Sequence, residues 1–256
     1  MKITVLSSGS KGNSSLIISE ECKLLIDLGT TCSYILNKLD DLNIKPEEID
    51  AILVTHIHSD HIKGLKTFIR KYKTTVYTTT KLLGLLEEEI GKFDYCIYDE
   101  ESTIIKDIKI NIFKTSHDAG ESLGFLIENN KKTLVYITDT GYINTRYHEM
   151  LKNKDMYIIE SNHDIKMLVE GPYPYYLQAR VRGDKGHLSN KQASNYLTKF
   201  IGNKTKSIIF IHLSEHNNTE EKVIETFNET MRKNNIIFNN YLVSHQNKPT
   251  EVIEIW

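Results

Sequence analysis

One stretch of seven residues constrains this chain more than any other: Thr55-His56-Ile57-His58-Ser59-Asp60-His61, directly after the apolar run 52–54. The run predicts a buried strand, so three imidazoles and a carboxylate lie where a strand gives way to a turn. His56 and His58 are two positions apart, and on an extended strand they point the same way and can bind one ion together. Asp60 and His61 follow in the turn and face another direction.

This segment predicts ligands for two adjacent cations, because imidazole suits zinc or iron and a carboxylate oxygen suits zinc, manganese or iron. The alternative is a surface loop that happens to be rich in histidine. An exposed loop, however, has no reason to follow a buried strand with the pattern His-x-His-x-Asp-His. We therefore interpret the segment as a metal site.

The pattern resembles the signature of the metallo-β-lactamase superfamily of binuclear metallohydrolases, and this resemblance indicates where further ligands lie. His117 follows the strand-like segment 108–113. An ion held by His56 and His58 needs a third protein ligand, and a histidine in this place completes the first metal site in the family. Asp139 follows the segment 133–137 and matches the family carboxylate that bridges the two cations. Its alternative role is a helix N-cap for the segment 143–151.

Three further residues take roles from the same resemblance. His212, after the segment 207–211, completes the second site with Asp60, His61 and Asp139, and His216 is the alternative for that role. His187 lies in Gly-His-Leu-Ser-Asn, which resembles an element of ribonuclease Z-like phosphodiesterases, and would act as general acid or electrostatic stabiliser for the leaving oxygen. Asp27 either orients a ligand imidazole or caps a turn.

The remaining segments alternate between strand-like and helical patterns without a linker. Their order predicts one domain over residues 1–256, an α/β (α+β) protein with two facing sheets and helices outside. This is the four-layer αββα sandwich of the superfamily, without an inserted cap domain. Helices are predicted at 62–73, 81–90, 143–151, 191–200 and 219–232, and the last strands near 236 and at 251–255.

Four motifs are most similar to the YycJ/WalJ-like branch: Ser-Ser-Gly-Ser-x-Gly-Asn-Ser, Glu-Ser-Asn-His-Asp, Gly-His-Leu-Ser-Asn and His-Leu-Ser-x-x-Asn-Asn. The resemblance implies a metal-dependent 5′-to-3′ exonuclease that prefers DNA over RNA. Two divalent cations about 3.5 Å apart, Zn²⁺ before Mn²⁺ or Fe²⁺, would hold a bridging hydroxide that Asp60 orients, and His187 would assist the leaving oxygen. The alternatives are a small-molecule phosphodiesterase or thioesterase, or a regulatory metal-binding protein of a cell-wall two-component system.

The charge balance limits how nucleic acid can bind. A formal net charge of -2 and a pI near 6.6 exclude a globally basic binder, so a polyanion must meet a local patch. Lys63 lies in the first turn of the helix predicted at 62–73, whose polar face carries only positive charge. Arg180 and Arg182 follow a tyrosine-rich stretch. The alternatives are a solvated helix face and a packed loop. His163 either supports a ligand or faces the substrate, or it is structural.

Cellular location is predicted from two absences in the sequence. No apolar run reaches the roughly 18 residues of a membrane span, and no signal peptide is recognisable. The three cysteines are scattered and form no CxxC pair, as expected for reduced thiols. These features predict a cytoplasmic protein without membrane insertion, and they leave homo-oligomerisation open.

Overall fold

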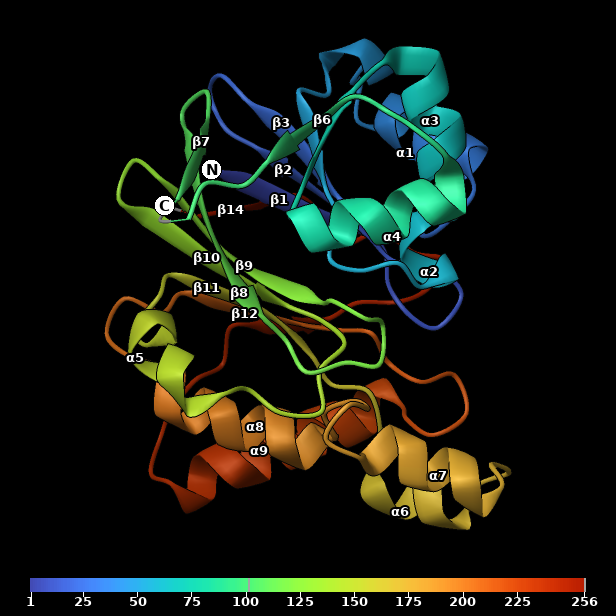
Figure 1. Cartoon of the computed structure of the whole chain (residues 1–256). Coiled ribbons are helices and arrows are strands. Elements are labelled where there is room, and N and C mark those ends of the chain that lie inside the picture. The colour runs from blue at the N-terminus through green and yellow to red at the C-terminus, as the bar shows by residue number, and fades with distance from the viewer. Residues whose placement is uncertain (101, 256) are drawn as a thin grey trace.

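The computed structural model describes residues 1–100 and 102–255, and two seven-stranded sheets lie face to face in it (Figure 1). The first sheet has the order β14 (Ile253–Glu254), β1 (Lys2–Ser7), β2 (Ser14–Ile18), β3 (Lys23–Ile26), β4 (Ala51–Leu53), β5 (Thr75–Thr78) and β6 (Tyr95–Ile97). The second has the order β13 (Tyr241–Val243), β12 (Ser207–Ile211), β11 (Met156–Glu160), β10 (Lys132–Ile137), β9 (Leu123–Asn129), β8 (Ile108–Lys114) and β7 (Thr103–Ile105).

Helices cover the outer faces of both sheets, which confirms the predicted sandwich. The first sheet carries α1 (Cys32–Asp41), α2 (Ser59–Ile62), α3 (Leu65–Tyr72) and α4 (Thr80–Ile90). The second carries α5 (His148–Leu151), α8 (Asn190–Phe200) and α9 (Glu220–Lys233), while α6 (Ile165–Glu170) and α7 (Tyr175–Arg182) project to one side. No helix in the described part of the chain is long and apolar enough to cross a membrane.

Each sheet is antiparallel at one end and parallel at the other. Strands β1 to β3 are antiparallel and β3 to β6 parallel, and the second sheet repeats this with β7 to β10 and β10 to β13. Parallel strands need crossover connections, and their carboxyl ends share one edge of the sheet. The loops after β4, β10 and β12 therefore emerge where binding sites of open α/β sheets commonly form.

Strand β10 shows why the sheets pack as they do. Successive side chains of a strand point to opposite faces. Leu134 and Tyr136 belong to the core between the two sheets, whereas Val135 and Ile137 belong to a second core beneath α8 and α9. A strand buried on both faces reads as a continuous apolar run, which is why its pattern could be recognised in the sequence.

Two predicted elements differ from the structure, and two observed helices were not predicted. The helix predicted at 143–151 is a 3₁₀ turn at Thr145–Tyr147 followed by the short α5. The strand predicted near 236 is wrong: Asn235 has φ 56° after α9, and the strand that pairs with β12 is β13. Helices α6 and α7 were not predicted.

Candidate metal centre

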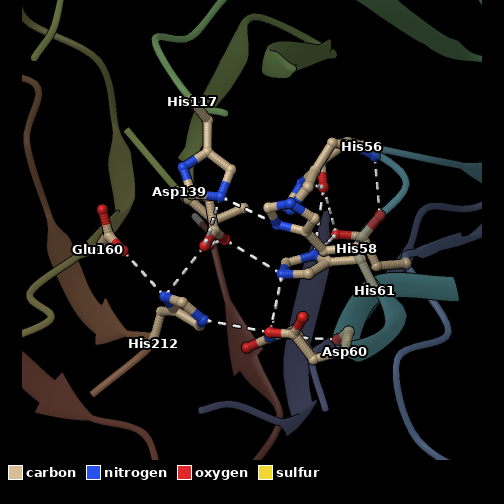
Figure 2. A network of polar contacts seen from close by, with 12 residues as sticks. His56, His58, Asp60, His61, His117, Asp139, Glu160 and His212 are labelled. Atoms are coloured by element: carbon tan, nitrogen blue, oxygen red, sulfur yellow. Dashed lines mark hydrogen bonds and ion pairs between the residues drawn. The ribbon is translucent and has the colours of Figure 1, made fainter. Parts of the chain in front are cut away.

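The seven predicted metal ligands lie together at the rim of the sandwich, and both sheets contribute to them (Figure 2). His56 and His58 follow β4, and Asp60 and His61 lie in α2. The remaining three follow strands of the second sheet: His117 after β8, Asp139 after β10 and His212 after β12.

Left-handed backbone at strand ends helps to aim these side chains. Asp27, Asp139 and His212 have φ of 57°, 46° and 58°, a conformation that is uncommon outside glycine and enriched in Asp, Asn and His. Each residue follows a strand closely and turns the chain sharply there. In Figure 2, Asp139 and His212 point into the centre of the cluster.

His56, His58 and His117 form one group of potential ligands. Their ligand atoms lie within 4.8 Å of one another, and His117 Nε2 is 3.1 Å from His58 Nδ1. Burial lowers the pKa of all three imidazoles, and the neighbouring His61 helps to lower that of His56. The three rings are therefore neutral at neutral pH, which is the state that binds a cation.

Asp60, His61 and His212 form a second group within the same 4.8 Å limit. Asp60 Oδ2 lies 3.6 Å from His61 Nε2 and 3.5 Å from His212 Nε2. Asp139 stands between the two groups, because its Oδ2 is 3.1 Å from His61 Nε2 and its Oδ1 is 3.8 Å from His117 Nε2. Oδ1 also lies 3.4 Å from His212 Nδ1, so the carboxylate is within reach of both groups, as a bridging ligand requires.

The charges of the second group also fit divalent cations. Burial by itself would raise the pKa of Asp139, but His212 and His61 hold it well below its usual range. Burial would lower the pKa of His61, yet Asp139 and Asp27 raise it to about 10. Positive charge is therefore favoured between these carboxylates. Nε2 of His56 and Nε2 of His212 are buried without a hydrogen-bond partner among the described residues, so both lone pairs can accept a cation.

Hydrogen bonds behind the ligands fix their orientation. His61 Nδ1 lies 2.7 Å from Asp27 Oδ2, and the Thr55 backbone N–H donates to Asp27 Oδ1 at 2.8 Å. Of the two roles predicted for Asp27, the structure favours orientation of the imidazole. Asn13, from the glycine-rich loop after β1, lies on the cation-facing side instead: its Nδ2 is 3.1 Å from His61 Nε2, and its backbone N–H donates to the Asp60 carbonyl at 2.8 Å.

Glu160 is a site residue that the sequence reasoning missed. It lies fully buried at the end of β11, with Oε1 2.7 Å from His187 Nδ1 and 2.9 Å from His212 Nδ1. Its Oε2 accepts the backbone N–H groups of Leu188 and Thr140. Burial opposes ionisation, but His187 and His212 lower the pKa of Glu160 to about 2. The available signal was a carboxylate closing an otherwise apolar strand, since a buried charge needs partners.

The predicted substrate residues differ in their positions. A hollow of about 230 Å³ opens over the ligands and is lined by Arg180 and His187, whereas Lys63 and Arg182 are exposed outside this lining. His163 also lies outside this lining, with a side chain that is only 1 % exposed, and burial lowers its pKa to about 4. The structural alternative fits, since its backbone forms a bridge to Ser189.

Two alternative assignments also fail. His216 packs edge to face against Tyr173, with ring centroids 6.2 Å apart, and does not join either ligand group. The side chain of Asn144, not that of Asp139, caps the turn that begins at Thr145.

Known proteins of the beta-lactamase superfamily are similar to this chain over most of its length. A family model described as beta-lactamase superfamily domain matches residues 25–213. Exodeoxyribonuclease WalJ of Streptococcus pneumoniae is 39% identical over 226 residues, with 86% of this chain and 84% of that protein covered. Exodeoxyribonuclease YycJ of Bacillus anthracis is 38% identical over 229 residues, with 86% and 85% covered.

Solved structures agree in fold. The metallo-beta-lactamase fold protein YhfI from Bacillus subtilis gives a TM-score of 0.74 at 16% identity, with 98% of this chain and 99% of that chain covered. A diphosphatase from the PhnP family gives 0.69 at 21% identity, with 99% and 98% covered.

Proposed function

Because the chain belongs to the beta-lactamase superfamily and, within it, to the WalJ/YycJ-like proteins, we propose that it is a nuclease that hydrolyses phosphodiester bonds with two divalent cations. It is a metal-dependent hydrolase of this family. The names of its relatives favour DNA as the polymer and exonucleolytic attack. Cleavage from 5′ to 3′ stays a prediction of the resemblance described above. Zn²⁺ is the favoured cation, ahead of Mn²⁺ and Fe²⁺.

The observation that carries this proposal is the division of the ligands into two groups joined by Asp139. His56, His58 and His117 would hold one cation, and Asp60, His61 and His212 the other. Both sheets contribute ligands to each group, so we also propose that residues 1–256 act as one hydrolase domain.

Two bound cations would lower the pKa of a water molecule so that hydroxide is available at neutral pH, and would offset the charge of the phosphate. The side chains around them have separate tasks. Asp60, whose carboxylate is partly accessible from the hollow, accepts a hydrogen bond from the attacking water and orients it. His187 gives a proton to the leaving oxygen.

Glu160 fixes the direction of that proton transfer. Its carboxylate accepts the Nδ1 proton of His187, so the proton that passes from a doubly protonated His187 to the leaving oxygen is the one on Nε2. Arg180, in the lining of the hollow, would contact the phosphate next to the cleaved bond. Lys63 and Arg182, which are exposed, would meet more distant phosphates of a long strand.

The test is a cleavage assay with purified protein loaded separately with zinc and with manganese. The substrates are end-labelled duplex DNA, single-stranded DNA and RNA, and His187→Ala is the matched variant. Metal-dependent shortening of a polymer by the wild type, reduced at least a hundredfold in the variant, supports the proposal. Turnover of a small phosphodiester alone would replace the nuclease by a small-molecule phosphodiesterase. No turnover of any substrate would refute both and favour a regulatory metal-binding protein.

A further inference from the structure

Helices α6 and α7 contribute little to the hydrophobic cores of the sandwich. The segment 165–182 connects β11 to α8, and neither core cluster includes any of its described residues. Only Leu168 and Val181 are buried among its hydrophobic side chains. Figure 1 shows the helix pair projecting beyond the layers. Packing of the sandwich therefore does not explain why the chain contains this excursion.

The same helix pair exposes large apolar side chains. Ile165 and Val169 are 46% and 49% exposed, and Tyr175 and Tyr176 are 85% and 75% exposed. An exposed apolar surface with polar neighbours commonly marks a binding site. Arg180, Arg182 and Lys185 supply positive charge along α7 and the loop after it.

One side of α7 forms a wall of the hollow above the proposed metal centre. Tyr173, Leu177, Arg180 and Val181 line that hollow. Leu177, Arg180 and Val181 are three and four positions apart, so they share one helix face. Tyr176 is about 100° from Leu177 around the helix and lies beside that face, whereas Tyr175 is about 200° away and lies on the opposite side.

Two contacts at the C-terminal end of α7 fix this wall against the ligand loops. Arg180 Nε donates to Asp118 Oδ2 at 2.7 Å, and Asp118 directly follows the ligand His117. Behind α7, a Cβ at Gly141 would lie 2.3 Å from the Asp184 carbonyl oxygen, so the turn after Asp139 packs directly on the loop that follows α7. The wall therefore has a fixed position relative to the reacting phosphate.

We propose that this wall, with Tyr173 and Tyr176 as its aromatic surfaces, stacks the unpaired bases at the end of a nucleic-acid strand. The proposal rests on the nuclease function above and names the form of its substrate. Aromatic rings beside cations are the groups that hold single strands, because every base offers a face for stacking and every linkage carries a negative charge. A strand end seated on the wall would bring its terminal phosphodiester over the metal centre, which favours cleavage from ends.

The experiment compares Tyr173→Ala and Tyr176→Ala with Tyr175→Ala, which removes a more exposed ring from the other side of the same helix. Binding of a fluorescently labelled single strand is measured by anisotropy after removal of metal, so the measurement does not depend on cleavage. A second strand has the same backbone but lacks bases at its terminal positions. KM and kcat are measured separately with metal present, and Tyr176→Phe tests whether the ring alone is sufficient.

Loss of one stacked ring should weaken binding of the normal strand roughly 5- to 150-fold. KM should rise by a similar factor, with a smaller change in kcat. Tyr175→Ala and Tyr176→Phe should bind the normal strand as the wild type does. For the strand that lacks terminal bases, the affinities of Tyr173→Ala and Tyr176→Ala should differ much less from that of the wild type.

Equal losses on both strands, or no loss in Tyr173→Ala and Tyr176→Ala, would overturn the proposal. So would a wild-type dimer that Tyr176→Ala converts to monomers in sedimentation, because a second copy would then cover this face. Failure of the nuclease proposal is a separate result, seen as a wild type that cleaves no polymer.

Discussion

Substitution of Asp27 by asparagine tests whether an internal hydrogen bond controls cation binding. Asp27 Oδ2 lies 2.7 Å from His61 Nδ1 in a fully buried pair. A carboxylate only accepts, so it holds the proton of His61 on Nδ1 and leaves the Nε2 lone pair for a cation. The amide group of asparagine donates, so Asp27→Asn removes this preference and favours a proton on Nε2.

We expect Asp27→Asn to weaken the binding of only one of the two cations. Loss of the partner that orients a ligand imidazole typically weakens metal affinity 10- to 100-fold, which corresponds to about 1.4 to 2.7 kcal/mol. The affected cation is the one that His61 binds. The group of His56, His58 and His117 makes no direct contact with Asp27 and should keep its affinity within a few-fold.

The assay is a titration of metal-free protein with Zn²⁺ against a competing chelator, which resolves a strong and a weak step. Asp155→Asn is the matched control, because Asp155 accepts from Thr133 N at 2.9 Å and Thr133 Oγ1 at 2.6 Å as Asp27 does from Thr55, but without a histidine. If Asp27→Asn weakened both steps equally, or weakened neither, or if the control lost as much affinity, the reasoning would be refuted.

Three further predictions concern the loop packing, the general acid and the protons of the site. Gly29→Ala should weaken cation binding and lower the melting temperature, because its Cβ would lie 1.6 Å from the Asp60 carbonyl oxygen; Gly84→Ala, with nothing within 4 Å, should instead stabilise α4 by about 0.5–1 kcal/mol in thermal unfolding. Glu160→Gln should lower kcat at saturating metal at least tenfold, since two imidazoles lose their charged acceptor, and an unchanged kcat would contradict this. Zn²⁺ binding should release protons and become tighter as the pH rises towards 10. The reason is that burial lowers the pKa of His61 but the neighbouring carboxylates raise it to about 10, so the cation must displace a proton. Calorimetric heats of binding that do not depend on the buffer would contradict this prediction.

Much of the fold could be predicted because its central strands are apolar on both faces. The predicted segment 207–211 has the bounds of β12, and the predicted segments 108–113 and 133–137 each differ from β8 and β10 by one residue. Helices α6 and α7 were missed for the opposite reason. They bury few side chains, and Pro172 and Pro174 interrupt the segment between them, so hydrophobic periodicity gives little signal there.

The candidate site divides in the same way. His56 to His61 are neighbours in sequence, and their spacing alone predicts ligands for two adjacent cations. The contact of Asn13 with His61, and that of Glu160 with His187 and His212, join residues from 27 to 52 positions apart. Such pairs depend on how strands are ordered in a sheet, and no local pattern encodes that order.

The arrangement of the ligands also explains why the site lies between two sheets instead of on one. The end of β4 offers His56 and His58 to one ion, but the short helix α2 that follows directly turns Asp60 and His61 toward another position. Closing both ion positions needs His117, Asp139 and His212, which reach the rim from the facing sheet. The buried, partnerless nitrogens of His56 and His212 are costly in the folded protein unless a cation binds them. Cation binding and the packing of the two sheets against each other are therefore coupled, so the same contacts that build the site also hold the two halves of the sandwich in register.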